Sequence, residues 1–266
     1  MSTPPLNKNE ENKRVLVVIP TLGQRVDLLN ATLLSIRSQY PVAYDIVMIY
    51  PLKNLETKDL ADRFGAISVE DPGGLSAALN VGISQAKPNH EFISWIGDDD
   101  LLATESFKTC IGALDANQEA VLAFGYCDYI DSDGKHLFTS RAGAIAPWLM
   151  TWGPNLVPCP GILFRTSALL RAGEFDVNSK YSMDLDMLLR LRKIGKFINT
   201  KKVLASFRWH ATSTTVANRG VVIRETERVK RKYLPTYLRR VAPVWEHPVR
   251  IATKIAAKRV NNMASK

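Results

Sequence analysis

The chain of 266 residues carries a formal net charge of +9 and is 46% hydrophobic, an ordinary composition for a protein that buries a sizeable core. No apolar run approaches the roughly 20 residues that span a bilayer, and the polar residues 1–13 are predicted to be a disordered leader, so neither a transmembrane helix nor a signal peptide is expected. An odd number of cysteines without metal-ligand spacing, Cys110, Cys127 and Cys159, indicates reduced thiols in a cytoplasmic protein.

Strand and helix patterns alternate through the first 70 residues. The apolar segments 14–20, 45–50 and 66–69 are predicted strands of the kind that is covered on both faces. Residues 27–40 and 54–64 lie between them and are predicted helices. Strands that alternate with helices predict a doubly wound, mostly parallel sheet.

A glycine turn at residues 73–74 then opens a predicted helix of small residues that runs to about Ala86. Small side chains let a helix pack closely on the sheet and let its first backbone amides approach a phosphate. The same pattern is equally expected of a plain turn before a close-packed helix.

Three consecutive carboxylates, Asp98, Asp99 and Asp100, follow the next predicted strand, which ends in Trp95-Ile96-Gly97. Ligands bind beyond the carboxyl ends of strands in open α/β sheets, and a cation there would relieve the repulsion between the carboxylates. Oxygen ligands of this type suit magnesium or manganese. The alternative is a solvated Asp-rich turn that caps the following helix.

The middle of the chain has weaker patterns. Residues 104–117 are a predicted helix with Thr104 as its N-cap, and residues 120–130 are a predicted strand. Asp-Ser-Asp-Gly at 131–134 favours a hairpin turn over a calcium loop, because the later Glu of such a loop is missing. Residues 141–160, rich in Ala, Gly and Pro, predict either a mobile loop that faces an acceptor or an irregular crossover.

A strand at 161–165 and a short helix at 166–172, ended by Gly173, follow. The next helix, residues 181–191, carries Asp184 and Asp186 in its first turn. The helix dipole favours acidic residues there, and a second interpretation takes Asp184 as a general base. The last strand of this part, 203–208, leads to His210, a residue type that is often no more than a hydrogen-bonded surface group.

Taken in order, these features resemble the inverting family 2 glycosyltransferases, which have the A-type glycosyltransferase fold. The resemblance extends over residues 14–215. It rests on motifs at the ends of the predicted strands and helices, which are Pro20-Thr21, Gly74 with Ala78-Leu79-Asn80-Val81-Gly82, the Asp triplet, Gly161 to Arg165 with Gly173-Glu174-Phe175-Asp176, Asp184-Leu185-Asp186 with Arg190, and Arg208-Trp209-His210 with Ser213.

The resemblance implies a role for each motif. A nucleotide-sugar donor would bind to residues of the strand ends and loops, which are Pro20, Thr21, Arg25, Gly74, Asn80, Asp98, Arg208 and His210. The Asp triplet would be the family's Asp-x-Asp element, which holds Mn²⁺ or Mg²⁺ on the donor diphosphate. Two registers, Asp98 with Asp100 or Asp99 with Asp100, both fit, so all three remain candidate metal ligands.

Asp184 would be the catalytic base, although Met183 stands where the family has Glu. It would deprotonate a hydroxyl of a glycan or lipid-linked acceptor, which then attacks the anomeric carbon with inversion. The family's second strand ends in Asp residues that help bind the base. Here it ends in Tyr50-Pro51, and Tyr50 is a candidate to stack on the base.

By the same resemblance, residues 14–218 would be the glycosyltransferase domain, with a nucleotide-sugar-binding half at 14–102 and an acceptor half at 103–218. Residues 219–266 would be a basic helical extension, because they hold 13 Lys and Arg against 3 Asp and Glu. Its prolines 235, 243 and 248 exclude one continuous helix. The spacing of the basic residues in 249–260 is typical of a helix that lies peripherally on an anionic membrane. A solvated basic helix is the alternative.

Two other classes of protein are possible. A protein that binds nucleic acid would explain the charge, but the basic residues avoid the predicted body and no array of stacking aromatics accompanies them, so no nucleic acid partner is expected. A sugar-nucleotide pyrophosphorylase would require a Gly-rich basic loop after the first strand, which residues 20–25 match poorly.

Overall fold

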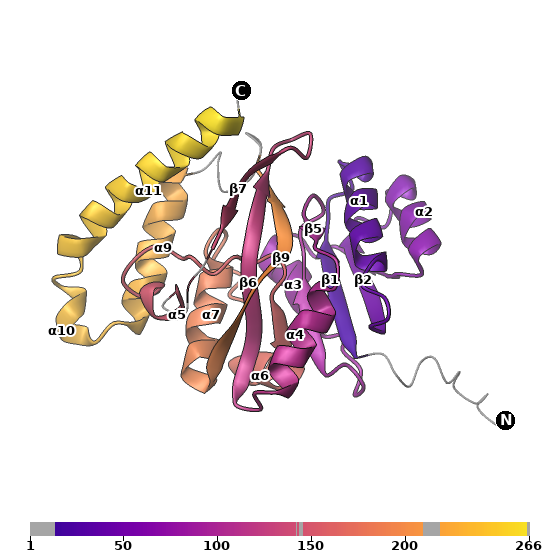
Figure 1. Ribbon diagram of the computed structural model, residues 1–266, viewed down its shortest axis with the longest axis horizontal. Coiled ribbons are helices and arrows are strands. Elements are labelled where there is room, and N and C mark those ends of the chain that lie inside the picture. The colour runs from indigo at the N-terminus through magenta and orange to yellow at the C-terminus, as the bar shows by residue number, and fades with distance from the viewer. Residues whose placement is uncertain (1–13, 142, 144–145, 210–218, 265–266) are drawn as a thin grey trace.

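In the computed structural model, which describes residues 14–141, 143, 146–209 and 219–264, the first third of the chain alternates strands and helices as predicted (Figure 1). The order of elements is β1 Val15–Pro20, α1 Val26–Arg37, β2 Tyr44–Tyr50, α2 Leu55–Phe64, β3 Ile67–Glu70, α3 Leu75–Ile83 and β4 Phe92–Trp95.

These strands form the parallel part of the sheet, in the order β3-β2-β1-β4. The apolar runs of β1 and β2 are buried on both faces, which is why they pair in parallel under covering helices. β1 ends at Pro20 and β4 ends at Trp95. Because the two strands run in the same direction, both ends lie at the same edge of the sheet. The loops that follow both strands therefore meet there.

The second part of the chain adds antiparallel pairings. Its elements are β5 Leu101–Leu102, α4 Ser106–Asp115, β6 Ala120–Ile130, β7 His136–Ser140, α5 Ala146–Leu149, β8 Leu163–Arg165, α6 Thr166–Ala172, α7 Met183–Ile194 and β9 Lys196–Arg208. The sheet continues from β4 as β8-β6-β9-β5, with β7 paired to β6, which makes nine strands among the described residues. β8 is antiparallel to both neighbours, whereas β9 runs parallel to β6. Most paired residues lie in parallel pairings, which confirms the predicted fold class.

The N-cap of α4 and the length of β9 differ from the sequence predictions. The Thr104 cap is wrong, because α4 begins at Ser106 after Glu105, whose φ of 59° is left-handed. The last strand is longer than predicted, since β9 follows β6 along its length across three register shifts. The hairpin turn at 131–134 is confirmed, because Asp131 accepts backbone hydrogen bonds from Asp133 and Lys135 at 3.0 and 2.8 Å.

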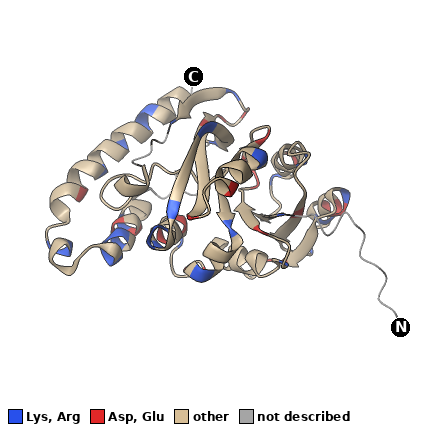
Figure 2. Cartoon of the chain, turned by 60° about the horizontal axis from the view of Figure 1, so that its bottom comes forward, with Lys and Arg blue, Asp and Glu red and all other residues tan. Residues whose placement is uncertain are grey.

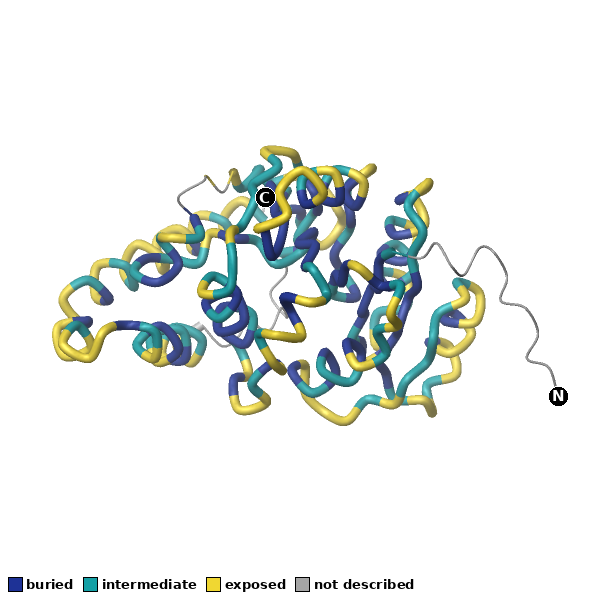
Figure 3. The backbone as a smooth tube through the Cα atoms, turned by 90° about the horizontal axis from the view of Figure 1, so that it is seen from below, coloured by how far each residue is buried: buried dark blue, intermediate teal, exposed yellow. Residues whose placement is uncertain are grey.

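Helices cover both faces of the sheet, so the hydrophobic core has two parts, one on each face. α1, α2 and α4 bury their apolar side chains on one face, and α3, α6 and α7 bury theirs on the other. Figure 3 shows the strands as mostly buried and the outer sides of the helices as exposed. The layers hold the strand ends rigidly, which is what a site at the sheet edge requires.

The C-terminal region consists of α9 Arg219–Tyr233, α10 Thr236–Arg239 and α11 Pro243–Ala264. α9 packs on the body, where Val229 is fully buried in the same core cluster as α7. α11 packs on α9 through ion pairs, Arg231 with Glu246 and Arg250 with Glu227. The helix predicted at 249–260 is confirmed as part of α11, although Pro248 lies inside that helix instead of breaking it.

Figure 2 shows Lys and Arg positions, coloured blue on the cartoon, distributed along the C-terminal helices. The positive charge assigned to a separate extension is therefore carried in part by α9, a helix that contributes to the core. None of the helices within the described ranges of the chain is both long and apolar enough to cross a membrane.

Candidate functional site

A cleft opens at the sheet edge where β1 and β4 end, and it has two connected parts. The first cavity has a volume of about 330 Å³ and the second about 310 Å³. Their shared wall consists of Pro20, Arg25, Leu75 and Asp98. The predicted residues of the first strand end and of the Asp triplet are thus brought together in one place.

The first cavity is lined largely by the ends of β1 and β2 and by the start of α3. Gly74, which the sequence predicted for the donor site, lines it with a φ of 90°, a conformation that favours glycine. Asp71 lines it as well, and its carboxylate accepts the amide of Gly73 at 3.0 Å. Asp71 was not predicted as a site residue from the sequence. Its position directly after the third parallel strand was the signal that could have found it.

Arg25 joins the two cavities through ion pairs with the Asp triplet. Its guanidinium donates to Asp98 Oδ1 at 2.7 Å and to Asp99 Oδ2 at 2.5 Å. Burial opposes the charge of Arg25, but the two carboxylates outweigh it and raise its pKa. The hydroxyl of Thr21 donates to Asp98 Oδ2 at 2.6 Å, so both oxygens of Asp98 have protein partners.

Asp100 is the most deeply placed member of the triplet. Thr32 Oγ1 donates to its backbone carbonyl at 2.8 Å, and the amide of Arg208 donates to its Oδ1 at 3.0 Å. Burial, followed by repulsion from Asp99, raises the pKa of Asp100 to about 8. The carboxylate therefore lies in a strongly negative, poorly solvated environment.

Arg208 fastens the loop that carries the triplet. Its side chain donates to the carbonyls of Asp99, Asp131 and Ser132 at 3.0, 3.1 and 2.9 Å. The loop is also held by β5, which pairs with β9 just before Arg208. Arg208 lines the second cavity, and these three side-chain hydrogen bonds are to backbone oxygens of the protein.

The triplet suits a divalent cation in its donor chemistry. No three His, Cys, Asp or Glu side chains converge as ready-made metal ligands within the described part of the chain. A side-chain Cβ placed on Gly97 would lie 3.2 Å from both Asp99 Oδ1 and Asp100 Oδ2, so these oxygens flank one small space. Magnesium in proteins commonly uses one or two carboxylates and completes its shell with substrate phosphates and water. This arrangement fits such a cation.

Asp184 lines the same second cavity as the triplet, from the first turn of α7. The Cys159 thiol lies 3.1 Å from its Oδ2 and donates a hydrogen bond to it. Burial raises the pKa of Asp184, while the Cys159 hydrogen bond acts in the opposite direction. Burial also keeps the pKa of the Cys159 thiol well above its ordinary value, so Cys159 stays a donor. Cys159, Lys180 and Tyr181 line this cavity and were not predicted from the sequence.

Two predicted residues, Asn80 and Tyr50, are not brought into the cleft. The Asn80 amide exchanges hydrogen bonds with the backbone of Phe175 at 3.0 and 2.8 Å, and Asn80 lines neither cavity. The hypothesis that Tyr50 stacks on a base is wrong, because Tyr50 is fully buried and its hydroxyl lies 2.9 Å from Ser68 Oγ. His210 lies outside the described residues.

The parallel part of the sheet ends at a cleft that is lined by carboxylates. Ligands of open α/β sheets bind in this position, so the fold and the cleft define a ligand-binding α/β protein. The family model described as "Glycosyl transferase family 2" matches residues 16–166, which is more than half of the chain. The chain belongs to this family. It is 23% identical over 227 residues to an uncharacterized glycosyltransferase of Rickettsia prowazekii. The match covers 79% of this chain and 68% of that protein. An uncharacterized glycosyltransferase of Rickettsia typhi matches to the same extent.

Solved structures share the fold at low sequence identity. S. aureus TarS 1-349 in complex with UDP-GlcNAc matches with a TM-score of 0.60 and 12% identity, over 81% of this chain and 65% of that one. The longer S. aureus TarS structure matches with a TM-score of 0.57 and 14% identity, over 80% of this chain and 39% of that one. This chain therefore spans less than two thirds of either solved chain.

Proposed function

We propose that the protein transfers a sugar from a nucleotide-sugar donor to a hydroxyl of a glycan or lipid-linked acceptor, with inversion at the anomeric carbon. The observation that carries this proposal is the second cavity, in which the Asp98–Asp100 triplet and Asp184 line one space. Family membership favours a glycosyltransferase over a pyrophosphorylase or a nucleic-acid-binding protein. The TarS structure with UDP-GlcNAc supports a nucleotide-sugar donor by analogy.

The first cavity suits the nucleoside. It is lined by apolar groups such as Ile49 and Ala78, and its polar groups include Asp71 and Gln24. A carboxylate and an amide can hydrogen-bond the edge of a base, which apolar walls alone cannot recognise. The diphosphate would then cross the shared wall at Arg25, whose guanidinium supplies positive charge.

A divalent cation, Mn²⁺ or Mg²⁺, would be held by Asp99 and Asp100 and would neutralise charge on the departing diphosphate. In this arrangement Asp98 has a different role, because Arg25 and Thr21 contact both of its oxygens. Asp98 would fix Arg25 beside the diphosphate. This assignment selects the second of the two registers that the sequence left open.

Asp184 would accept the proton of the acceptor hydroxyl. The acceptor oxygen then forms a bond to the anomeric carbon while the bond from that carbon to the diphosphate breaks, and the nucleoside diphosphate leaves with the bonding electrons. Burial raises the pKa of Asp184, which makes its carboxylate a stronger base than an exposed one. In-line attack gives the inverted product.

The outer face of α11 suits a membrane-linked acceptor. Val244, Ile251 and Ile255 are 76%, 47% and 51% exposed, and helical spacing places them on one stripe opposite the buried Glu246 and Ala257. Exposed basic residues, among them Lys254 and Lys258, accompany the stripe. Apolar groups beside cations complement an anionic lipid surface, so the protein would act peripherally on the cytoplasmic face of a membrane.

The test is a transfer assay with a panel of nucleotide sugars, manganese or magnesium, and glycan or lipid-linked acceptors. Asp184→Asn should lower kcat by about 10²–10⁴-fold and leave donor affinity within roughly threefold, because the amide keeps the shape but accepts no proton. Asp100→Asn should weaken metal-dependent donor binding. Asp59→Asn, an exposed change on α2, is the matched control.

Release of a nucleoside diphosphate would support transfer, whereas net formation or consumption of pyrophosphate would identify a pyrophosphorylase instead. Full transfer activity in both Asp184→Asn and Asp100→Asn would contradict the mechanism. Turnover without any added or bound divalent cation would contradict the metal assignment alone.

A further inference from the structure

The loop of residues 176–182 is the last part of the connection between α6 and α7, and it forms one wall of the second cavity through Lys180 and Tyr181. It ends at Ser182, the residue before α7, and Asp184 follows two residues later. The position of Asp184 in the cleft therefore depends on how this loop enters the helix. The contacts that hold the loop come mostly from outside it.

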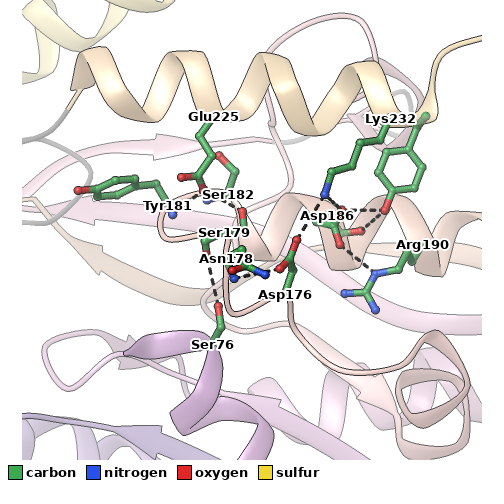
Figure 4. Close-up of polar contacts among 11 residues, drawn as sticks. Ser76, Asp176, Asn178, Ser179, Tyr181, Ser182, Asp186, Arg190, Glu225 and Lys232 are labelled. Carbon is green, nitrogen blue, oxygen red and sulfur yellow. Dashed lines mark hydrogen bonds and ion pairs between the residues drawn. The ribbon is translucent and has the colours of Figure 1, made fainter. Parts of the chain in front are cut away.

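Glu225 on α9 is the centre of these contacts. Its Oε1 accepts hydrogen bonds from Ser179 Oγ and from the backbone amides of Tyr181 and Ser182, each at 2.8 Å. Figure 4 shows Glu225 reaching from α9 to the loop. Glu225 is 9% exposed, so its carboxylate faces the loop instead of solvent. Burial would raise the pKa of Glu225, but these hydrogen bonds outweigh it and lower the pKa, so the carboxylate is charged at neutral pH.

The start of α7 is anchored to α9 in place of the usual cap. Ser182 occupies the N-cap position, but among the described residues its hydroxyl contacts Thr226 Oγ1 at 2.9 Å instead of capping α7. A helix normally fixes its first turn through the N-cap side chain. Here Glu225 of α9 accepts hydrogen bonds from the amides of Tyr181 and Ser182 immediately before α7. The neighbouring helix α9 therefore sets where α7 begins.

Further contacts fix the loop from two sides. Ser76 at the start of α3 donates to the carbonyl of Ser179 at 3.2 Å, and α3 also borders the first cavity. At the other end of α9, the Tyr233 hydroxyl lies 2.9 Å from Asp186 Oδ1, and Lys232 lies 3.4 Å from Asp176. The loop is thus held between α3 and α9, and Glu225 is the charged group at the centre.

We propose that Glu225 is a positioning residue for the cleft, which holds the 176–182 loop so that Lys180 and Tyr181 form the acceptor wall and Asp184 is aimed at the acceptor hydroxyl. This inference rests on the proposed function. It makes α9, part of the basic C-terminal region, a component of the catalytic apparatus. Removal of Glu225 would lower the rate of transfer more than the affinity for the donor, because the donor binds mainly in the first cavity and at the triplet.

The experiment compares Glu225→Ala with Glu227→Ala in the full chain. Glu227 is the matched control, because it lies on the same helix and pairs with Arg250 of α11 at 2.9 Å instead of holding the loop. Hydrogen exchange of peptides covering residues 179–186 is measured together with transfer kinetics and thermal unfolding. For Glu225→Ala we expect exchange at Tyr181 and Ser182 to become at least roughly tenfold faster, and kcat to fall about 100-fold with donor KM within roughly threefold.

Glu225→Gln should recover most of the rate, because the amide oxygen still accepts hydrogen bonds. A purely structural role would instead lower kcat in Glu225→Ala and Glu227→Ala in proportion to their loss of thermal stability. If Glu225→Ala does not fold, Glu225→Met fills the same volume without an acceptor and takes its place. Wild-type exchange in the 179–186 peptides, or wild-type kcat, in a folded variant would overturn the inference. A wild-type protein without transfer activity would overturn the proposed function, whereas the exchange result would still test the loop contact.

Discussion

At the scale of single residues, burial of Asp184 and the hydrogen bond from Cys159 act in opposite directions on the pKa of the proposed base. Burial raises the pKa of Asp184, and the thiol hydrogen bond to its Oδ2 limits that rise. A base must be unprotonated to work, so transfer should slow as the pH falls through the raised pKa of Asp184. The acid limb of the rate profile should therefore lie above the range of an exposed aspartate.

Cys159→Ala should move this acid limb to higher pH. Without the thiol donor the charged form of Asp184 loses a stabilising hydrogen bond, so its pKa rises further. The measurement is kcat as a function of pH for wild type and variant. Cys110→Ala, which removes a buried thiol in the other core cluster, serves as the control and should leave the limb unchanged. A limb that stays in place or moves to lower pH in Cys159→Ala would contradict this role of the thiol.

The sequence predicted some of these residues and missed others for a physical reason. Asp98–Asp100 and Asp184 stand in local patterns, a strand end and a helix start, that carry information by themselves. Cys159 and Glu225 acquire their roles only through contacts with residues 25 and 43–46 positions away. A single sequence contains no sign of such pairs. Asn80 shows the reverse case. It matches the family pattern, but the nitrogen and the oxygen of its side-chain amide both hydrogen-bond the backbone of Phe175.

At the scale of elements, α3 approaches the sheet closely because it is built from small residues. A Cβ at Gly82 would lie 2.8 Å from Ile49 Cδ1 and closer still to Val18 Cγ1. The side chain of Val18 is β-branched and stiff, so it cannot easily move away. Since α3 begins at Gly74 in the first cavity, a shift of this helix would also change that cavity.

Gly82→Ala should therefore destabilise the protein by about 1–3 kcal/mol and weaken donor binding, because overpacking displaces α3 from β1 and β2. The free energy of unfolding is measured in urea. Gly112→Ala on α4 is the matched control, because a Cβ there has open space and an exposed helical glycine costs about 0.5–1 kcal/mol relative to alanine. We expect the control to be stabilised. Equal effects of the two substitutions would show that the close approach of α3 has no energetic importance.

The elements that the sequence predicted best were the buried parallel strands, since their apolar runs need no partner to be recognised. β5 was missed because two residues form a strand only when β9 is beside them. The true length of β9 was missed for the same reason, since its first half is mostly polar and follows β6 only through tertiary pairing. The helix of small residues was predicted correctly, because a run of small residues after a glycine turn has few other structural explanations.

At the scale of the whole molecule, the C-terminal helices divide between two environments. α9 faces the core, whereas the outer face of α11 presents an apolar stripe and cations to its surroundings. A surface of this kind would hold the cleft near a lipid-linked acceptor. Salt would weaken the attachment, because lysine and arginine contribute through charge.

The paired substitution of Ile251→Glu and Ile255→Glu should weaken binding to phosphatidylcholine vesicles that contain phosphatidylglycerol by roughly tenfold or more, since it removes apolar contact and adds negative charge. Co-sedimentation at low and high salt measures the effect. Leu34→Glu with Leu170→Glu, exposed leucines on α1 and α6, is the matched control and should bind like wild type. Equal binding of the wild type to vesicles with and without phosphatidylglycerol would contradict an electrostatic attachment.

The fastening of the Asp loop by Arg208 has a consequence for biosynthesis. The amide that bonds Asp100 Oδ1 lies 108 positions further along the chain, and β5 pairs with the strand that carries it. A ribosome releases the carboxylates of residues 98–100 long before Arg208. A nascent chain that ends within the first half cannot complete this loop, so the second cavity, which Phe207 and Arg208 line, is assembled only after β9 has been synthesised.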